Sequence, residues 1–285
     1  MTTNIKTTAT TDRLILVIGG TGKTGRRIVE KLRVRGVPSR VGSRTGDPAF
    51  DWGDVGTWAP ALDGVKAAYI SYAPDLAVPG ALETVRAFTR QAVRAGVERL
   101  VLLSGRGEDE AQACERVIAL SGVEWTVVRA AWFMQNFSEG EFLDMIMSGE
   151  ITLPAGKVAE PFVDVDDIAD VAVAALTEDD HDGQTYEVTG PKLMTFHDVA
   201  RAIATASERE VAYTPIPHAA FVDGLKFMGM PDEMIWLMDY LFKTVLDGRN
   251  AYVADGVKRA LGREAKDFTA FAKDAATAGV WSTAA

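Results

Sequence analysis

The sequence predicts an α/β fold in which helices cover both faces of a doubly wound parallel sheet. An apolar run at residues 14–18 ends in a glycine-rich turn that opens a helical pattern. Strand-like and helix-like segments then alternate to about residue 130, at the spacing of right-handed βαβ crossovers. The 285 residues, of which 47% are hydrophobic, suffice for one such domain with a smaller lobe.

Each element follows from local pattern. The first strand is expected at residues 14–18 and the first helix at residues 24–36, because Gly36 is a typical helix stop. The next strands are expected at residues 39–43, 49–52, 67–71, 99–104 and 125–129. The helices between them are expected at residues 57–62, 79–95 and 110–121.

Beyond residue 130 the alternation weakens. A loop and helix are expected at residues 133–149, a strand and helix at 161–176, a strand at 184–189, and helices at 196–206 and 231–246. These elements are expected to complete the sheet and to form a small mixed lobe over its carboxyl edge. The expected division is a disordered tail at 1–12, a main domain at 13–155 and a C-terminal part at 156–285.

The glycine-rich turn fits the G-x-G-x-x-G motif of dinucleotide-binding Rossmann domains. Glycine permits the tight turn, the approach of backbone to pyrophosphate and the packing of the helix, whose N-terminus attracts phosphate. A Walker A loop is excluded because Val17 stands where that motif requires its first glycine. The turn residues expected to hold the cofactor are Gly19, Gly20, Thr21, Gly22, Lys23, Thr24 and Gly25.

The turn after the second strand indicates which dinucleotide binds. NAD-binding domains carry Asp or Glu there for the ribose hydroxyls, but this turn reads Gly42-Ser43-Arg44-Thr45. Arginine suits a 2′-phosphate by charge and by paired N–H donors. NADP(H) is therefore the expected cofactor, bound in part by Ser43 and Arg44; the alternative is that Arg44 is a solvated turn residue.

Other strand ends are expected to complete the cofactor site. Asp51 and Trp52 are placed for the edge and face of the adenine, and Ser71 and Tyr72 for the middle of the cofactor. Ser104 ends the strand at residues 99–104 and is expected to contact the cofactor as well.

Composition excludes several function classes. The net charge of −10, without a long Lys/Arg run, argues against nucleic-acid binding, and no apolar run approaches a membrane span. The single cysteine, Cys114, is expected in the core and fits a reducing cytoplasm.

No metal site is expected, because His181, His197 and His218 lack ligand spacing and are expected at the surface or in loops. The acidic group Asp164, Asp166 and Asp167 is expected to cap a helix.

Taken together, these motifs resemble the atypical branch of the short-chain dehydrogenase/reductase superfamily that is related to the fungal regulator NmrA. The matching features are the glycine turn, Arg44 and residues 101–104, 127–129, 132–137 and 162–169. Within the branch, Phe50-Asp51-Trp52 and residues 229–231 resemble the festuclavine synthase and agroclavine dehydrogenase group. The resemblance implies NADPH-dependent reduction of a cyclic iminium and leaves the substrate open.

One departure from the superfamily's pattern concerns its Tyr-x-x-x-Lys pair. Gly107 and Ala111 stand near the expected tyrosine and lysine positions, and the motif occurs nowhere in the chain. An iminium needs no proton in the hydride step, and a quinone or conjugated alkene needs only modest acid assistance. We therefore expect a reductase of such acceptors, whose candidate catalytic residues are Tyr72, Ser104, Trp132 and Gln135.

A small hydrophobic or aromatic substrate is expected to contact Trp132, Phe133 and Asn136, although the two aromatic residues could equally belong to the lobe core. Glu115 is expected to be a surface charge, with a contact to a cationic substrate as the alternative.

Late apolar residues leave two questions open. The Met and aromatic side chains of residues 221–242 could line a pocket or fill a core, and Trp236, Leu237 and Tyr240 could face outward in a homodimer. Two other functions also remain open: an NmrA-type NADP(H) sensor without turnover, and an isomerase that retains its cofactor.

Overall fold

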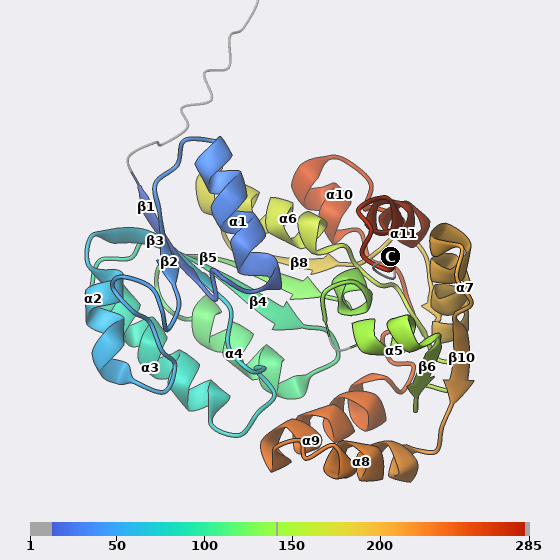
Figure 1. Ribbon diagram of the computed structural model, residues 1–285. Helices are drawn as coiled ribbons and strands as arrows, with labels where there is room; N and C mark the ends of the chain where they lie inside the picture. The colour runs from blue at the N-terminus through green and yellow to red at the C-terminus, as the bar shows by residue number, and fades with distance from the viewer. Residues whose placement is uncertain (1–12, 141, 283–285) are drawn as a thin grey trace, which may run out of the picture.

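A computed structural model describes residues 13–140 and 142–282, and the tail expected at residues 1–12 lies outside them (Figure 1). Within the described residues the main sheet has six parallel strands. Their order across the sheet is β2 (Ser39–Gly42), β1 (Leu14–Ile18), β3 (Val65–Ile70), β4 (Arg99–Gly105), β5 (Glu124–Ala130) and β8 (Gln184–Val188). The chain adds β2 on one side of β1 and then crosses over to add β3 on the other side, and this switch in strand order leaves a crevice at the carboxyl ends of β1 and β3. The predicted fold class is confirmed.

Two helical layers cover the sheet, as Figure 1 shows. One layer contains α1 (Lys23–Val34), α6 (Val165–Thr177) and α10 (Gly256–Leu261), and the other contains α2 (Trp58–Leu62), α3 (Ala81–Arg94) and α4 (Asp109–Ala119). Ile15 and Val17 of β1 pack under the first layer, and Leu16 and Ile18 under the second. The central strand is apolar on both faces because both faces are covered.

The prediction of a strand at residues 49–52 is wrong. This segment forms a turn in which Asp51 pairs with Asp54, and the Asp51 carboxylate accepts the backbone N–H of Gly53 at 2.9 Å. A short 3₁₀ helix, η1 (Val55–Thr57), follows it. Phe50 is buried because its ring packs against Trp58 and Phe88, so its apolar character reflects loop packing and not strand pairing.

The lobe is built from segments that lie far apart in the sequence. Two small sheets pair β6 (Glu150–Leu153) with β10 (Ala212–Pro215) and β7 (Ala159–Glu160) with β9 (Met194–Thr195). The surrounding helices are η2 (Met134–Phe137), α5 (Leu143–Ser148), α7 (Phe196–Ser207), α8 (His218–Phe227), α9 (Asp232–Tyr240) and α11 (Phe268–Thr277). The lobe therefore contains residues from both sides of the expected domain boundary at residue 155. The division of the chain at that boundary stays a prediction.

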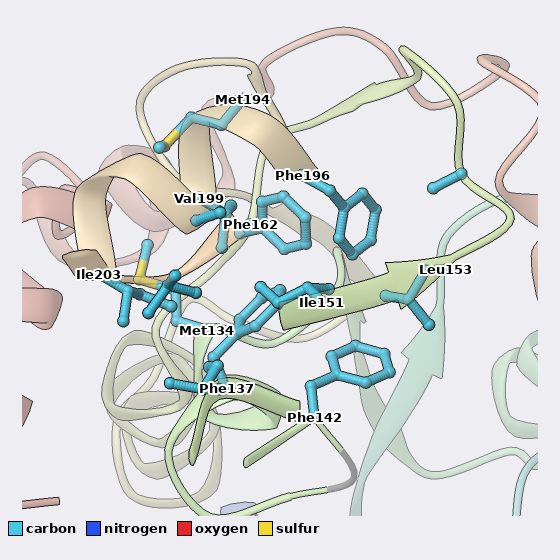
Figure 2. Packing of buried hydrophobic residues seen from close by; sticks show 14 of the residues in the cluster. Met134, Phe137, Phe142, Ile151, Leu153, Phe162, Met194, Phe196, Val199 and Ile203 are labelled. Atoms are coloured by element: carbon cyan, nitrogen blue, oxygen red, sulfur yellow. The ribbon is translucent and has the colours of Figure 1, made fainter. Parts of the chain in front are cut away.

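Aromatic side chains fill the core of the lobe. Figure 2 shows Phe137, Phe142, Phe162 and Phe196 converging from separate segments. Their ring centroids lie 5.3–6.4 Å apart, mostly in edge-to-face contacts. The indole N–H of Trp281 donates to the carbonyl of Phe137 at 2.9 Å, which ties the end of the described chain to this core.

The helix expected at residues 231–246 divides in two. α9 ends at Tyr240 and continues as one π-helical turn, η3 (Leu241–Val245).

Among the described residues, no helix is both long and apolar enough to cross a membrane.

Candidate active site

A cavity of about 880 Å³ opens at the carboxyl ends of β1, β3 and β4 and extends to the lobe. Sheet and lobe segments both line it, so residues far apart in sequence share one space. Of the expected site residues, those that line it are Gly19, Thr21, Gly22, Lys23, Thr24, Ser43, Arg44, Asp51, Trp52, Ser71, Tyr72, Ser104, Trp132, Phe133 and Asn136. Gly20, Gly25 and Gln135 are not among the lining residues.

The glycine turn forms a cradle between β1 and α1. A β-carbon on Gly25 would overlap the carbonyl oxygen of Gly19, so only glycine lets the helix sit this close to the turn. Gly22 caps α1 without a side chain, and the helix N-terminus faces the cavity. A backbone cradle with a positive helix end is what a pyrophosphate requires, and these residues fit a dinucleotide.

Thr24 contributes only its backbone to this cradle. Its side chain is buried, and its hydroxyl accepts a hydrogen bond from the Tyr69 hydroxyl at 2.9 Å. Tyr69 lies in β3, so the bond joins the first turn of α1 to the centre of the sheet. The side chain of Thr24 therefore fixes the position of the helix and is not directed at a phosphate.

The end of β2 lacks a carboxylate in the structure as in the sequence. Arg44 is exposed and lines the cavity directly after this strand. Trp52 lies across from it in the following loop, where its indole N–H donates to the carbonyl of Ser71 at 3.1 Å. The Trp52 ring lies 4.9 Å from that of Tyr72, so the two rings form one wall of the cavity.

Ser104 belongs to a buried charged network that the sequence interpretation missed. Its hydroxyl donates to Glu115 at 2.6 Å, and Arg129 holds the same carboxylate through Nε at 2.9 Å and a second N–H at 2.5 Å. Arg129 also pairs with Glu187 at 2.9 Å. The hydrogen bond that Arg129 donates to Glu115 is the main cause that raises the pKa of Arg129.

Glu115 is therefore not a surface charge, since only 8% of the residue is exposed. Its helix carries buried Ala111, Cys114 and Ile118, and Glu115 shares their face at the i, i+3, i+4, i+7 spacing. That periodicity, together with an arginine in the apolar strand β5, was the signal that could have found the pair. Cys114 lies in the core as predicted.

Hydrogen bonds to the N-terminus of α6 hold the Gln135 side chain away from the cavity. Its amide N–H donates to Asp164 at 2.9 Å, and its amide oxygen accepts the backbone N–H of Val165 at 2.9 Å. Asp164 in turn caps α6 by accepting the N–H of Asp166 at 2.8 Å. The capping prediction for the acidic group is confirmed, whereas Gln135 positions this helix terminus and cannot reach an acceptor.

The histidines were expected at the surface or in loops, and His181 does lie in the loop before β8, although its side chain is buried. His181 is buried, 2.9 Å from the Tyr186 hydroxyl, and His218 is half-buried, 2.6 Å from Asp239. His197 is exposed. Over the described part of the chain no group of three or more His, Cys, Asp or Glu side chains is arranged to hold a metal ion.

The lobe supplies an apolar wall opposite the glycine turn. Met234, Leu237 and Met238 of α9 line the cavity, together with Leu241 of η3. Of the two roles left open by the sequence, pocket or core, these four side chains therefore have the pocket role. Leu237 is buried and does not face outward, whereas Trp236 is 41% exposed and stacks on Tyr240 at 5.5 Å. Trp132 joins the wall and packs edge-to-face on Phe242 at 5.2 Å.

Two acidic side chains in the cavity were absent from the sequence interpretation. Asp75 follows β3 and Glu108 follows β4, and their carboxyl groups lie on the cavity wall close enough to interact. Glu108 is only 6% exposed. Neither residue belongs to a motif, and only the pairing of β3 with β4 brings them together.

Comparison with known proteins identifies the family. The model of the NmrA-like family matches residues 50–272. An NAD(P)H azoreductase from Xenophilus azovorans is 31% identical, covering 93% of this chain and 99% of the relative. An agroclavine dehydrogenase from Claviceps fusiformis is also 31% identical, covering 91% and 96%.

Among solved structures, an NADPH-dependent quinone oxidoreductase from Escherichia coli, complexed with NADPH, superimposes with a TM-score of 0.77. It is 22% identical and covers 91% of this chain and 99% of its own, a likeness that supports the fold. The family predicted from the sequence motifs is confirmed: the chain belongs to the NmrA-like family.

Proposed function

We propose that the protein is an NADPH-dependent reductase that transfers hydride to a C=N bond, or to a conjugated quinone or enone, of a small hydrophobic molecule. NADP(H) is the cofactor. The observation that carries the proposal is the single cavity that joins the glycine cradle and Arg44 to the apolar wall of α9. A cofactor and an acceptor can meet there under cover of the lobe.

Different parts of this cavity suit different parts of the cofactor and the acceptor. The cradle at Gly19–Gly25 and the N-terminus of α1 suit the pyrophosphate, and Arg44 suits a 2′-phosphate. When bound, the cofactor supplies the hydride. Trp132, Leu237 and Met238 then orient a flat acceptor and exclude water from it.

The choice of acceptor follows from the missing Tyr-Lys pair. Ser104 keeps the position next to the cavity, but its hydroxyl proton is directed to Glu115 and not into the open space. Carbonyl reduction to an alcohol, which needs an acid at the oxygen, is therefore disfavoured. An iminium already carries its positive charge, and conjugated acceptors spread the charge that develops.

The relatives support a reductase over the alternatives. The azoreductase and the agroclavine dehydrogenase are named as redox enzymes, and the chain matches both across more than nine-tenths of its length. Their named substrates differ, so they support the reaction type and leave the substrate of this chain open.

Single-turnover oxidation of protein-bound NADPH tests the proposal. The protein is mixed with NADPH and then with a panel of cyclic imines, quinones and enones, while loss of nicotinamide absorbance is followed. Oxidation by at least one class is expected. Tight binding without oxidation by any class would favour an NADP(H) sensor, and product formation without net oxidation would favour an isomerase.

A further inference from the structure

Reduction of a neutral acceptor leaves a negative charge that must be protonated, and the usual tyrosine is missing. Ser104 does not replace it, because its hydroxyl donates to Glu115, whose carboxylate also accepts a hydrogen bond from Arg129. The proton source must therefore be sought elsewhere on the cavity wall. Asp75 and Glu108 are carboxyl groups on that wall.

The two carboxyl groups are held together by the sheet. β3 and β4 are neighbouring parallel strands, and Asp75 and Glu108 follow their carboxyl ends. The Asp75 carboxylate accepts the backbone N–H of Ala77 at 2.7 Å, which fixes its orientation. Burial is the main cause that raises the pKa of both carboxyl groups, and two interacting carboxyl groups favour holding a proton between them.

The surroundings place that proton on Glu108. Burial raises its pKa well above the usual carboxyl range, and the negative charges of Asp75, Glu110 and Glu115 raise it further. Burial also raises the pKa of Asp75, but the N–H of Ala77 favours its ionised form. Tyr240 of α9 faces the same group and donates to Glu110 at 2.6 Å.

A close contact holds the Glu108 side chain in place. Its carboxyl group lies over the backbone of Gly105, where any β-carbon would overlap it. Gly105 is the last residue of β4, next to Ser104. The acid group thus lies at the cavity end of β4, where Ser104 and Gly105 line the same cavity.

We propose that the Asp75–Glu108 pair is the acid that protonates a neutral acceptor during reduction. The proposal rests on the reductase function proposed above. When a hydride reaches the β-carbon of an enone, the C=C π pair forms a new double bond between the α-carbon and the carbonyl carbon, and the C=O π pair moves onto the oxygen. Glu108 gives its proton to that oxygen, so its O–H bond breaks and an enol O–H bond forms. The pair is left with two negative charges and regains one proton from water.

The test compares Glu108→Gln with Glu83→Gln, a matched loss of one carboxylate on the exposed face of α3. Single-turnover rates are measured with a neutral cyclic enone and with an N-methylated cyclic iminium, which needs no proton. Glu108→Gln is expected to lower the ratio of the enone rate to the iminium rate about 100-fold. Glu83→Gln is expected to keep the wild-type ratio.

Infrared spectroscopy of the protein without cofactor gives an independent readout. The difference between the wild-type and Glu108→Gln spectra is expected to show the carbonyl stretch of a protonated carboxylic acid at neutral pH, because the contribution of Glu160, whose pKa is about 7, is common to both proteins and cancels. Asp75→Asn, which keeps Glu108, is expected to shift the loss of this band to lower pH, because the neighbouring negative charge is gone.

An unchanged rate ratio in Glu108→Gln, or the absence of the infrared band from the difference spectrum, would overturn the assignment. So would an equal loss with both acceptors, or a loss confined to the iminium, since these indicate a structural or cation-binding role. A wild type that oxidises NADPH with neither acceptor would instead contradict the proposed reductase function.

Discussion

Replacing Glu115 by Gln removes the central charge of the network behind Ser104. The carboxylate accepts hydrogen bonds from Ser104 at 2.6 Å and from two N–H groups of Arg129 at 2.9 and 2.5 Å. Removing one partner of a buried ion pair typically costs about 3–5 kcal/mol. Arg129 keeps 21% of its side chain exposed and retains Glu187, so the expected loss is smaller, about 2–3 kcal/mol.

For a chain of this size that loss corresponds to a fall in Tm of about 4–8 °C. Thermal unfolding followed by circular dichroism measures it, with Glu30→Gln as the control. Glu30 pairs with Arg33 on the exposed face of α1, so its substitution should leave the Tm unchanged. Equal Tm values for Glu115→Gln and the wild type would refute the view that this network holds β4 and β5 to α4.

Three further predictions address the cofactor cradle, its specificity and a buried acid. Gly25→Ala should abolish NADPH binding in a fluorescence titration, because the new β-carbon overlaps Gly19; Gly224→Ala, with open space around it, should bind normally. Arg44→Ser should lower the preference for NADPH over NADH about tenfold in dissociation constants, since an exposed charge-assisted contact is lost. Burial raises the pKa of Glu160 to about 7, so the native state holds this proton more tightly than the unfolded chain. Stability should therefore fall by about 3 kcal/mol as pH rises from 4.5 to above 7, and Glu160→Gln should raise the Tm at pH 8 but not at pH 4.5.

The sheet was predictable because its strands are short apolar runs between glycine stops. The first strand matches at both ends, and the glycine turn around Gly22 precedes the first helix as predicted. The strand expected near Phe50 failed because burial of one aromatic ring in a loop imitates a strand pattern.

The positions of the buried acidic residues at and behind the cavity could not be predicted from local sequence pattern. Glu115 shares a helix face with Cys114, but recognising it as buried requires its partner Arg129, which comes from another strand. Asp75 and Glu108 meet only because β3 and β4 are neighbours. Local pattern shows neither contact, since both depend on the order of strands in the sheet.

Parallel fluorescence titrations of the purified protein with NADPH and NADH test the central claim most directly. If the cavity joins a dinucleotide cradle to the apolar lobe, NADPH binds at least about tenfold more tightly than NADH, and a flat hydrophobic acceptor quenches the bound nicotinamide signal. Binding of neither dinucleotide would contradict the account.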